Sequence, residues 1–583
     1  MGSGARRLER VTNAQIAAAF DELADLYELD GAVQYRVLAY RTAARTVREA
    51  SVSVAQLVRD GRVTELAGIG KTLETKLETL IETGDTTQAQ KLRAQFPSGV
   101  IAMMHLPGFG PKRARRLYDE LGIDSLEALR AAAEQEKLRG LRGFGAKVEE
   151  KLLEQLADGY DGRPAPRVLL SRAVPIAEQV VDALRGVPGA ERVEVAGSLR
   201  RQADSVKDLD VIATAADPAA LVRALTKLPI VESVDSSGDA GGRVTTHSGM
   251  KVDLKVVEPD QFGNVLQHFT GSKDHNVALR EAAVKRGLHV SEYGILDDAT
   301  GETLRCATEE EVYTKLGLAW IPPELRQGRG ELAAAAAGTL PELVTLADLR
   351  GDLHSHTKLS DGNQDVEAMV EGARARGYEY LAITDHSASH GFGNHVDADA
   401  LRTQIERVRA LNATLDDFEV LIGTETNVLT DGSLDYDDKL LEQLDWVVAS
   451  VHTSFGMSEK EMTARMVAAI EHPLVDVIGH PTGRKIETRA PYALDIERVI
   501  EAAARTHTML EINAAPDRRD LNEIHARAAA AAGVLIVVDS DAHSVRNLAL
   551  MSYGIATARR AWLTPAQVAN TRTWAQLAPL RKR

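Results

Sequence analysis

With 583 residues the chain is too long for one compact core, and its length predicts about three to five domains. Its composition (44% hydrophobic, 26% charged) excludes wholesale disorder, and the absence of a long apolar run or a signal-peptide core favours a cytoplasmic protein with no membrane partner. The net charge of −16 argues against indiscriminate polyanion binding, and the single Cys306 excludes a disulfide framework or a zinc site built from cysteines.

Residues 12–160 have a helical pattern, with runs such as Asn13–Leu29 and Val33–Glu49. Three segments in this region share a glycine–hydrophobic–glycine turn at the start of a helix, and a lysine follows each second glycine. Such a turn exposes backbone amides at a helix N-terminus, which suits a phosphate oxygen. The pattern resembles the helix-hairpin-helix motif of DNA-binding proteins, and a glycine-capped helix connection is the alternative. The resemblance predicts DNA contacts at Gly68, Gly70, Gly108, Gly110, Gly143 and Gly145.

Over roughly residues 8–90 the chain also resembles the lyase domain of family X DNA polymerases. The resemblance places the Schiff-base lysine of that domain at Lys76, whereas Thr72 replaces a second lysine that contacts a 5′-phosphate. A nucleophilic lysine needs a lowered pKa, so a solvated helix residue is the alternative reading of Lys76. We expect a phosphate-binding edge at Tyr35, Arg36, Tyr40 and Arg41, and abasic-site lyase activity as a secondary function.

From about residue 168 short β-rich runs alternate with helices, which predicts an α/β domain with strands at Arg192–Ala196, Leu209–Ala213 and Lys251–Val257. Asp208 and Asp210 are two residues apart on one strand and therefore share a face. Asp253, on another strand, supplies a third carboxylate. Three carboxylates are suited to Mg²⁺ or Mn²⁺, and two such ions can clamp the oxygens of a phosphoryl transfer.

A Gly-Ser turn followed by arginines, about ten residues before these carboxylates, offers donors to a triphosphate. Together these features resemble the nucleotidyltransferase palm, and the downstream segment 267–272 resembles the family X DNA polymerases. Relative to that family His268 replaces a tyrosine, which leaves the strength of ribonucleotide exclusion open. Lys207 stands where the family often has a glycine, and it could either hold the triphosphate more tightly or distort the turn. The resemblance implies nucleotide contacts at Gly197, Ser198, Arg201, His268, Phe269, Gly271, Asn276 and Arg280, and it assigns a thumb motif to residues 292–294.

The last third of the chain is acidic and rich in histidine. Residues 341–583 contribute −11 of the net charge, and 11 of the 16 histidines lie at or after His354. Apolar runs such as YLAITD, FEVLIG and VLIVVD alternate with helical runs, which predicts a parallel β/α barrel. Histidines and carboxylates follow most of these strands, at the edge where barrel enzymes place their chemistry. We therefore predict a metal site.

This region resembles the PHP domain, a distorted (β/α)₇ barrel with a trinuclear metal cluster. Mixed imidazole and carboxylate ligands favour Mn²⁺, Fe²⁺ or Zn²⁺ over Ca²⁺. Arg484 and Arg518 are candidates for holding phosphate, with a solvated surface role as the alternative. The resemblance implies metal ligands at His354, His356, Asp361, His386, Glu425, His452, His480, Asp541 and His543.

The order of these parts resembles the bacterial family X DNA polymerases that carry a C-terminal PHP domain, over nearly the full length. We expect a multidomain α/β protein and predict six regions: a helical lyase-like domain with the first hairpin (1–90), a fingers-like helical region with two more (91–165), a nucleotidyltransferase palm (166–260), a thumb (261–327), a linker (328–349) and the PHP barrel (350–583). The linker is rich in alanine, and part of it could be helical.

The resemblance implies a monomeric DNA repair polymerase that fills gapped or nicked DNA with dNTPs at Asp208, Asp210 and Asp253, using Mg²⁺ or Mn²⁺. The barrel would act as a metal-dependent 3′–5′ exonuclease that processes the same DNA ends, as in base excision repair. Two alternatives stay open. The chain could be a phosphoesterase of DNA ends whose palm only positions the substrate, or a non-enzymatic scaffold that binds DNA ends.

Overall fold

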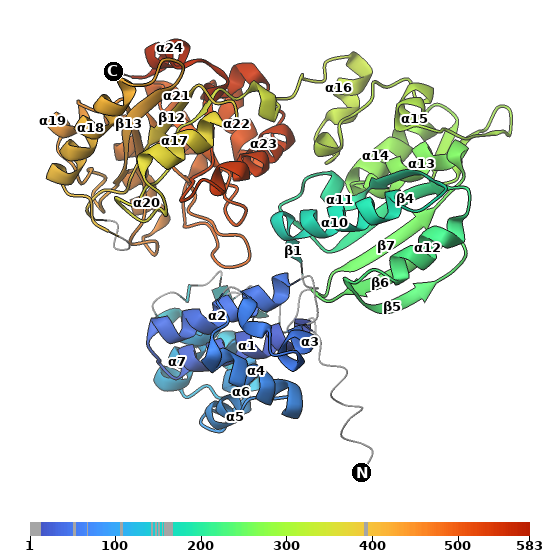
Figure 1. The fold of residues 1–583 in the computed structure, drawn as a ribbon, viewed down its shortest axis with the longest axis horizontal. Coiled ribbons are helices and arrows are strands. Elements are labelled where there is room, and N and C mark those ends of the chain that lie inside the picture. The colour runs from blue at the N-terminus through green and yellow to red at the C-terminus, as the bar shows by residue number, and fades with distance from the viewer. Residues whose placement is uncertain are drawn as a thin grey trace. The chain divides into compact units, whose positions relative to one another are not determined.

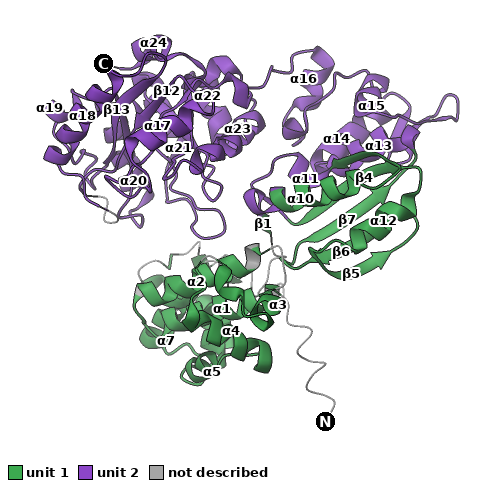
Figure 2. Cartoon of the chain, viewed as in Figure 1, with its two compact units in different colours: residues 1–168, 175–195, 207–258 green, residues 169–174, 196–206, 259–583 purple. Residues whose placement is uncertain are grey.

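The computed structural model describes residues 13–50, 54–66, 68–104, 106, 109–141, 144–145, 148–149, 152–153, 156, 167–389 and 394–582. The chain divides into two compact units, which are described separately (Figure 2). Unit 1 comprises residues 1–168, 175–195 and 207–258, and unit 2 comprises residues 169–174, 196–206 and 259–583. Within the described ranges, no helix combines the length and the apolar character needed to span a bilayer.

The N-terminal part of unit 1 is helical, as the sequence predicts. α1 (Asn13–Leu29) and α2 (Gln34–Glu49) match the two predicted helices and pack against each other. Their buried faces include Phe20, Leu23 and Val47, because apolar residues recur at helical spacing. The remaining helices here are α3 (Val54–Arg59), α4 (Lys71–Thr83), α5 (Thr87–Arg93), α6 (Ser98–Met104), α7 (Gly110–Leu121) and α8 (Leu126–Glu134).

Unit 1 also contains a five-stranded mixed sheet in the order β2-β4-β7-β6-β5 (Figure 1). The predicted strands are confirmed to within two residues at each end. β4 pairs in parallel with β7, and the other neighbours are antiparallel. The helix α12 (Pro218–Thr226) packs against β5 and β6. The strands are β2 (Ala190–Val195), β4 (Asp208–Ala215), β5 (Val231–Ser237), β6 (Gly241–Thr246) and β7 (Lys251–Val256).

Unit 2 begins with a small helical region that surrounds Tyr313, a fully buried side chain. The short helix α16 (Glu331–Ala337) lies in the predicted linker, so part of that alanine-rich segment is helical. The other elements of this region are α10 (Leu170–Arg185), shared between the units, α11 (Gly197–Arg200), α13 (Phe262–Thr270), α14 (Lys273–Val284), α15 (Glu309–Lys315), and an antiparallel sheet of β8 (Leu288–Ser291), β9 (Gly294–Asp297) and β10 (Thr303–Leu304).

The C-terminal part of unit 2 is the predicted parallel barrel, whose seven strands follow chain order from β11 to β17. A bridge between Ser355 and Ala542 brings the first and last strands together. Side chains such as Leu353 and Trp446 fill the interior, and helices surround the strands (Figure 1). The strands are β11 (Gly351–Asp352), β12 (Tyr380–Ile383), β13 (Glu419–Asn427), β14 (Trp446–Ser450), β15 (Val477–Ile478), β16 (Met509–Asn513) and β17 (Ile536–Asp539).

Each barrel strand is followed by a connection that ends in a helix, so the carboxyl ends of all strands open toward the same loops. Most of these helices start at an acidic or polar cap, such as Asp365 for α17 and Ser458 for α20. The helices are α17 (Val366–Arg374), α18 (Ala398–Asn412), α19 (Asp438–Leu441), α20 (Glu459–Glu471), α21 (Ile496–Thr506), α22 (Glu523–Ala531), α23 (Met551–Arg560) and α24 (Trp574–Leu577).

Candidate functional site

Glu425, on β13, lies at the centre of a buried cluster at the carboxyl ends of the barrel strands. Its Oε2 is 2.7 Å from Nδ1 of His386 and 3.4 Å from Nε2 of His354. Its Oε1 is 3.0 Å from Nε2 of His480 and 3.2 Å from Nε2 of His452. One carboxylate therefore contacts imidazoles that follow four different strands.

Two further carboxylates complete the cluster. Oδ1 of Asp541 is 3.1 Å from Nε2 of His356, and Oδ2 of Asp361 is 3.2 Å from Nε2 of His543. The structure thus brings all nine predicted metal ligands together, although they span nearly 200 residues of sequence. They converge because the strands are parallel and every ligand lies at or beyond the carboxyl end of a strand.

Carboxylates and imidazoles of the cluster shift one another's pKa, and not all in the same direction: burial lowers the pKa of His356 and His480. Burial alone would raise the pKa of Glu425, but the surrounding imidazoles, His386 foremost, lower that pKa well below its usual range. The pKa of Asp541 is likewise lowered against the effect of burial, with His354 as the strongest contributor. Conversely, burial opposes the charged form of His354, but nearby carboxylates raise its pKa well above its usual range.

These side chains fit divalent metal ions. Ligand atoms of His356, Asp361, His386 and His543 lie within 4.8 Å of one another, and two groups of three ligand atoms adjoin them. The Nδ1 atoms of His356 and His480 are buried, and neither has a hydrogen-bond partner among the described residues. A bound cation would satisfy such nitrogens. A donor set of imidazole and carboxylate suits manganese, iron or zinc.

Two supporting residues, Glu511 and Asn513, are absent from the predicted ligand set. Glu511 Oε1 lies 2.6 Å from Nδ1 of His354, and its Oε2 accepts the backbone N–H of His480. The Asn513 amide donates to Asp541 at 3.0 Å. Both residues lie on one face of β16, and the alternation in the run TMLEIN places them together without indicating that this face is buried.

The backbone next to the candidate ligands packs closely against neighbouring strands and adopts unusual φ angles. A side chain at Gly479 would lie 2.4 Å from Ser450 Oγ and 2.8 Å from Val448 Cγ1, so only glycine fits before His480. His480 and Asp541 have positive backbone φ angles of 29° and 51°, which residues other than glycine rarely adopt. Such conformations persist where surrounding contacts hold them, and they are typical of functional sites.

The cluster lies on the wall of a cavity of about 570 Å³. Three basic side chains, Lys485, Arg489 and Arg518, line the same cavity, together with the aromatic ring of Phe455. The predicted phosphate-binding residue Arg518 is therefore at the cavity, whereas Arg484 is ion-paired with Asp204. A cavity with metal ligands on one side and cations on another suits a phosphate ester.

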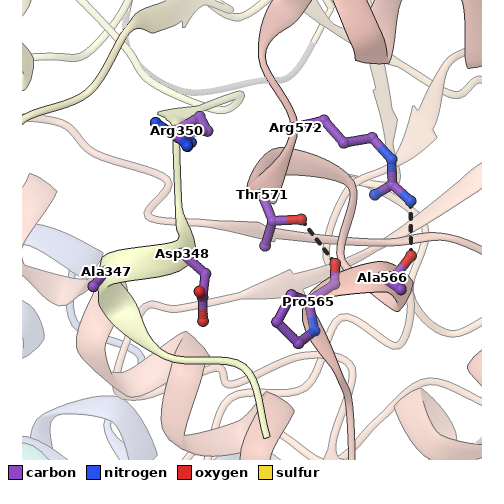
Figure 3. Close-up of a pocket in the computed structure, with 7 residues that line it drawn as sticks. All are labelled: Ala347, Asp348, Arg350, Pro565, Ala566, Thr571 and Arg572. Atoms are coloured by element: carbon purple, nitrogen blue, oxygen red, sulfur yellow. Dashed lines mark hydrogen bonds between the residues drawn. The ribbon is translucent and has the colours of Figure 1, made fainter. Parts of the chain in front are cut away.

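A second, shallower cavity of about 370 Å³ lies next to the start of β11 (Figure 3). Its two arginines are engaged within the protein. Arg350 is 2.6 Å from Glu379, and Arg572 donates to the carbonyl groups of Val568 and Ala566. Unlike the first cavity, this one is not lined by any of the candidate metal ligands.

The sheet of unit 1 brings the three predicted carboxylates together. Asp210 lies opposite Asp253 in the parallel pairing of β4 and β7, and Asp208 shares the face of Asp210. Arg243, on β6 opposite Asp253, places its Nε 2.5 Å from an oxygen of that residue. The sequence prediction did not include Arg243, which carries a countercharge for a carboxylate group that could bind metal.

The predicted nucleotide-binding residues meet in unit 2. Gly197 begins α11 with a φ angle of 65°, and Arg201 donates to the carbonyl of Thr270 at the end of α13. The amide of Asn276, on α14, donates to the carbonyl of His268, on α13, at 2.8 Å. The remaining members lie on the same elements: Ser198 on α11, Phe269 on α13, Gly271 between α13 and α14, and Arg280 exposed on α14.

The described hairpin turns are open to approach. Nothing within the described ranges lies within 4 Å of where a side chain would sit at Gly70, Gly110 or Gly145. Gly70 caps α4 and Gly110 begins α7, so backbone amides at both helix starts can reach a phosphate. Gly68 has a φ angle of 83° and lies against α2 side chains. Gly108 and Gly143 lie outside the described residues.

The lysine predicted for lyase chemistry lies beside aromatic rings. Lys76 is half-buried on α4, with its ammonium nitrogen 5.7 Å from the ring centre of Tyr40. Tyr40 is buried and stacks on Tyr27 at 5.3 Å, whereas Tyr35 is 84% exposed. Arg41 is ion-paired with acidic residues of α1. Tyr35 is therefore the aromatic ring of this set that is open to a ligand.

Four family models match the chain. They are the helix-hairpin-helix domain (residues 11–86), the SAM-like helix-hairpin-helix tandem (100–158), the DNA polymerase beta thumb (265–327) and the PHP domain (352–515). The DNA polymerase/3′-5′ exonuclease PolX of Bacillus subtilis (strain 168) is 38% identical over 570 residues, which is 97% of this chain and 99% of that protein.

Shorter relatives align with about a third of the chain. A probable phosphatase of Caldanaerobacter subterraneus subsp. tengcongensis is 33% identical over 205 residues, 33% of this chain and 75% of that protein. A probable phosphatase of Thermoanaerobacter sp. (strain X514) is 31% identical over 233 residues, 38% of this chain and 89% of that protein.

Proposed function

The chain belongs to the PolX family of DNA polymerase/3′-5′ exonucleases, and on that premise we propose that it is a monomeric cytoplasmic repair enzyme. It fills short gaps in DNA with dNTPs and removes 3′-terminal nucleotides in its barrel. The observation that carries the second activity is the cluster of nine imidazoles and carboxylates, seven of which line one cavity together with three cations. Divalent ions would hold the phosphate there and lower its charge.

In gap filling, Asp208, Asp210 and Asp253 would hold Mg²⁺ or Mn²⁺, which would stabilise charge on the transferred phosphate. The primer 3′-oxygen attacks the α-phosphorus of a dNTP, a new P–O bond forms, and pyrophosphate leaves. The turn at Gly197 would supply backbone donors to the triphosphate, and Arg201 a countercharge. Arg243 holds Asp253 in place from the neighbouring strand.

In excision, water adds to the last phosphodiester of a DNA strand and the P–O3′ bond breaks. A nucleoside 5′-monophosphate leaves, and the shortened strand ends in a 3′-hydroxyl. The nine barrel ligands would hold Mn²⁺, Zn²⁺ or Fe²⁺ as a trinuclear group, with Glu425 touching most of the set. Arg518 lines the cavity and would bind the phosphate.

The helical N-terminal part would grip the DNA backbone through the amides at Gly70, Gly110 and Gly145. Lys76 is the proposed nucleophile of a secondary abasic-site lyase activity. Its amine forms a Schiff base with the sugar aldehyde and water leaves; loss of the C2′ proton then breaks the C3′–O bond and releases the downstream strand with a 5′-phosphate. Hydrolysis of the imine frees the lysine. Its half-buried place beside Tyr40 supports this role, since a lysine needs partial desolvation to act as a nucleophile.

The test uses a 5′-labelled primer on DNA with a one-nucleotide gap, with Mg²⁺ or Mn²⁺ and with or without dNTPs. We expect Asp208→Ala to abolish extension only and His354→Ala to abolish shortening only. The matched controls are Asp239→Ala, an exposed loop carboxylate, and His289→Ala, an exposed histidine outside the barrel. Neither control should change either product by more than about twofold.

Two outcomes would replace the proposal. Shortening without extension under every condition would favour a phosphoesterase of DNA ends, and unchanged products in both variants would favour a scaffold. A 3′-phosphorylated primer tests one more candidate. The barrel relatives named probable phosphatases favour release of inorganic phosphate from such an end.

A further inference from the structure

Phe455 forms part of the cavity wall, three residues after the candidate ligand His452. Its ring is only partly buried, and two flat groups lie against it. The guanidinium carbon of Arg489 is 4.3 Å from the ring centre, and the ring of Tyr492 lies 6.1 Å away with an angle of 7° between the planes. The wall therefore carries a stacked set of planar groups.

Hydrogen bonds hold these planar groups in place. Nε of Arg489 donates to the carbonyl of Gly483 at 2.8 Å, and the hydroxyl of Tyr492 donates to the carbonyl of Pro481 at 2.7 Å. At Gly483 a side chain would lie 2.3 Å from the Tyr492 ring, so glycine permits this packing. Because the groups are already ordered, a planar ligand would lose little of its binding energy to fixing them.

Arg489 also remains available for a ligand. Among the residues that the structure describes, no carboxylate lies within ion-pair distance of its guanidinium. Burial is the main reason that the pKa of Arg489 is lowered, and the positive charge of Arg518 adds to it. Arg518 and Lys485 line the same cavity as Arg489, and Lys485 is paired with Asp517 at 3.4 Å. Arg489 and Arg518 therefore give this wall positive charge that an anion could neutralise.

Packing alone does not account for this arrangement. If the guanidinium of Arg489 served only to cover the Phe455 ring, we would expect it to pair with a carboxylate or to face bulk water. Instead, Arg489 lines the same cavity as the candidate metal ligands. Flat guanidinium and aromatic groups are the surfaces on which proteins stack unpaired bases, and the neighbouring cations suit phosphates. One ligand has both features, the terminal nucleotide of a single DNA strand.

We propose that Phe455 and Arg489 form a stacking platform for the base of the 3′-terminal nucleotide, while Arg518 and Lys485 bind the phosphates beside it. The inference rests on the proposed 3′–5′ exonuclease function of the barrel. Stacking accepts any base, so the platform would not select sequence. A base that stacks here has left its complementary strand. The platform therefore selects frayed, mismatched or single-stranded 3′ ends over paired ones.

The test replaces the planar groups and follows the end of the DNA directly. A single-stranded oligonucleotide carries 2-aminopurine, whose fluorescence falls on stacking, as its 3′-terminal base. It is titrated with the full chain in EDTA, so binding is read without metal or turnover. We expect wild-type protein to quench the probe, Phe455→Leu to weaken the quenching interaction about tenfold, and Phe455→Trp to retain it.

Arg489→Lys keeps the charge and loses the plane, so it should weaken quenching as Phe455→Leu does. Its matched control is Arg498→Lys, an exposed position on α21, which should behave as wild type. With metal added, we expect Phe455→Leu to raise KM for a mismatched 3′ end about tenfold and to change kcat less than twofold. Tm values within a few degrees of wild type would show that the variants fold.

Quenching and KM that stay at wild-type values in Phe455→Leu and Arg489→Lys would overturn the platform. Failure of the proposed exonuclease would be seen separately, as a wild-type protein that shortens no 3′ end. In that case the metal-free titration still decides whether a terminal base stacks at Phe455. Quenching of the same size from a probe within a paired end would also count against the platform.

Discussion

Glu511 controls the orientation of candidate ligands without reaching the cavity itself. It is fully buried, and its two oxygens bind His354 and the backbone of His480. Because Nδ1 of His354 faces Glu511, the other ring nitrogen of His354 points toward Glu425. A carboxylate behind a metal-binding imidazole sets the ring orientation and raises its basicity, so its effect on metal binding is large.

We therefore predict that Glu511→Gln, which keeps the shape and removes the charge, weakens metal binding by the barrel about 10- to 100-fold. The measurement is the metal retained per chain after dialysis against a graded series of chelator concentrations. Glu501→Gln, an exposed position on α21, is the control and should retain metal as wild type does. Equal retention in both variants would show that His354 needs no carboxylate behind it.

Residue by residue, the local pattern predicted a metal site, because most of the histidines and carboxylates follow an apolar run directly. The set of nine ligands came from the resemblance to the PHP domain and not from the pattern alone. Glu511 and Arg243 were harder to find. Both lie inside strands, and a charged residue inside a strand predicts a solvent-exposed side chain until the neighbouring strands are known. Their partners, His354 and Asp253, come from strands that the sequence does not place side by side.

At the scale of elements, the buried carboxylate of Glu309 ties the start of α15 to two other segments. Its oxygens lie 2.7 Å from Arg200, at the end of α11, and 2.5 Å from the fully buried Arg326. Burial alone would raise the pKa of Glu309, but Arg326 and Arg200 lower it to about 2. The ionised form is thus stabilised in the folded state relative to the unfolded chain.

Because the pKa of Glu309 is lower in the folded state than in the unfolded chain, its ionised carboxylate stabilises the fold at any pH above the unfolded-state pKa of 4.5. This stabilisation is lost as the pH falls from 4.5 toward the folded-state pKa of about 2. We predict that wild-type unit 2 loses on the order of 3 kcal/mol over this range through Glu309, and that Glu309→Gln flattens the loss. All four tryptophans lie in unit 2, so the measurement is denaturation followed by tryptophan fluorescence between pH 6 and pH 2. Parallel pH profiles for the two proteins would contradict it.

The strands and long helices were predictable as elements because alternation and helical periodicity are local properties. The short ones were not. The strands β8, β9 and β10 have two to four residues each, too few for a pattern. The alanine-rich linker left open whether part of it is helical, and α16 is that helix. α16 is anchored by Glu331, whose carboxylate lies 2.7 Å from the buried His275, a contact between residues 56 apart.

At the scale of the molecule, three arginines of the barrel hold the short segment that follows α11. Arg519, which is fully buried, and Arg484 contact the carboxylate of Asp204 at 3.2 and 3.0 Å. Arg560 donates to the carbonyl of Arg201 at 2.8 Å. These partners are more than 270 residues apart, so no local pattern indicates them. The barrel therefore positions a segment that also carries proposed nucleotide-binding residues.

Removing one partner of a buried ion pair leaves the other charge without compensation, which costs more than removing both. We predict that Asp204→Ala destabilises unit 2 by on the order of 3 kcal/mol, and that Arg519→Leu added to it restores part of this loss. The readout is again denaturation followed by tryptophan fluorescence. Glu367→Ala, which breaks the half-exposed pair with Arg407, should cost less than about 1 kcal/mol. Strictly additive effects of the two substitutions would show that Asp204 and Arg519 are not coupled, and the barrel would then hold the segment through its backbone contacts alone.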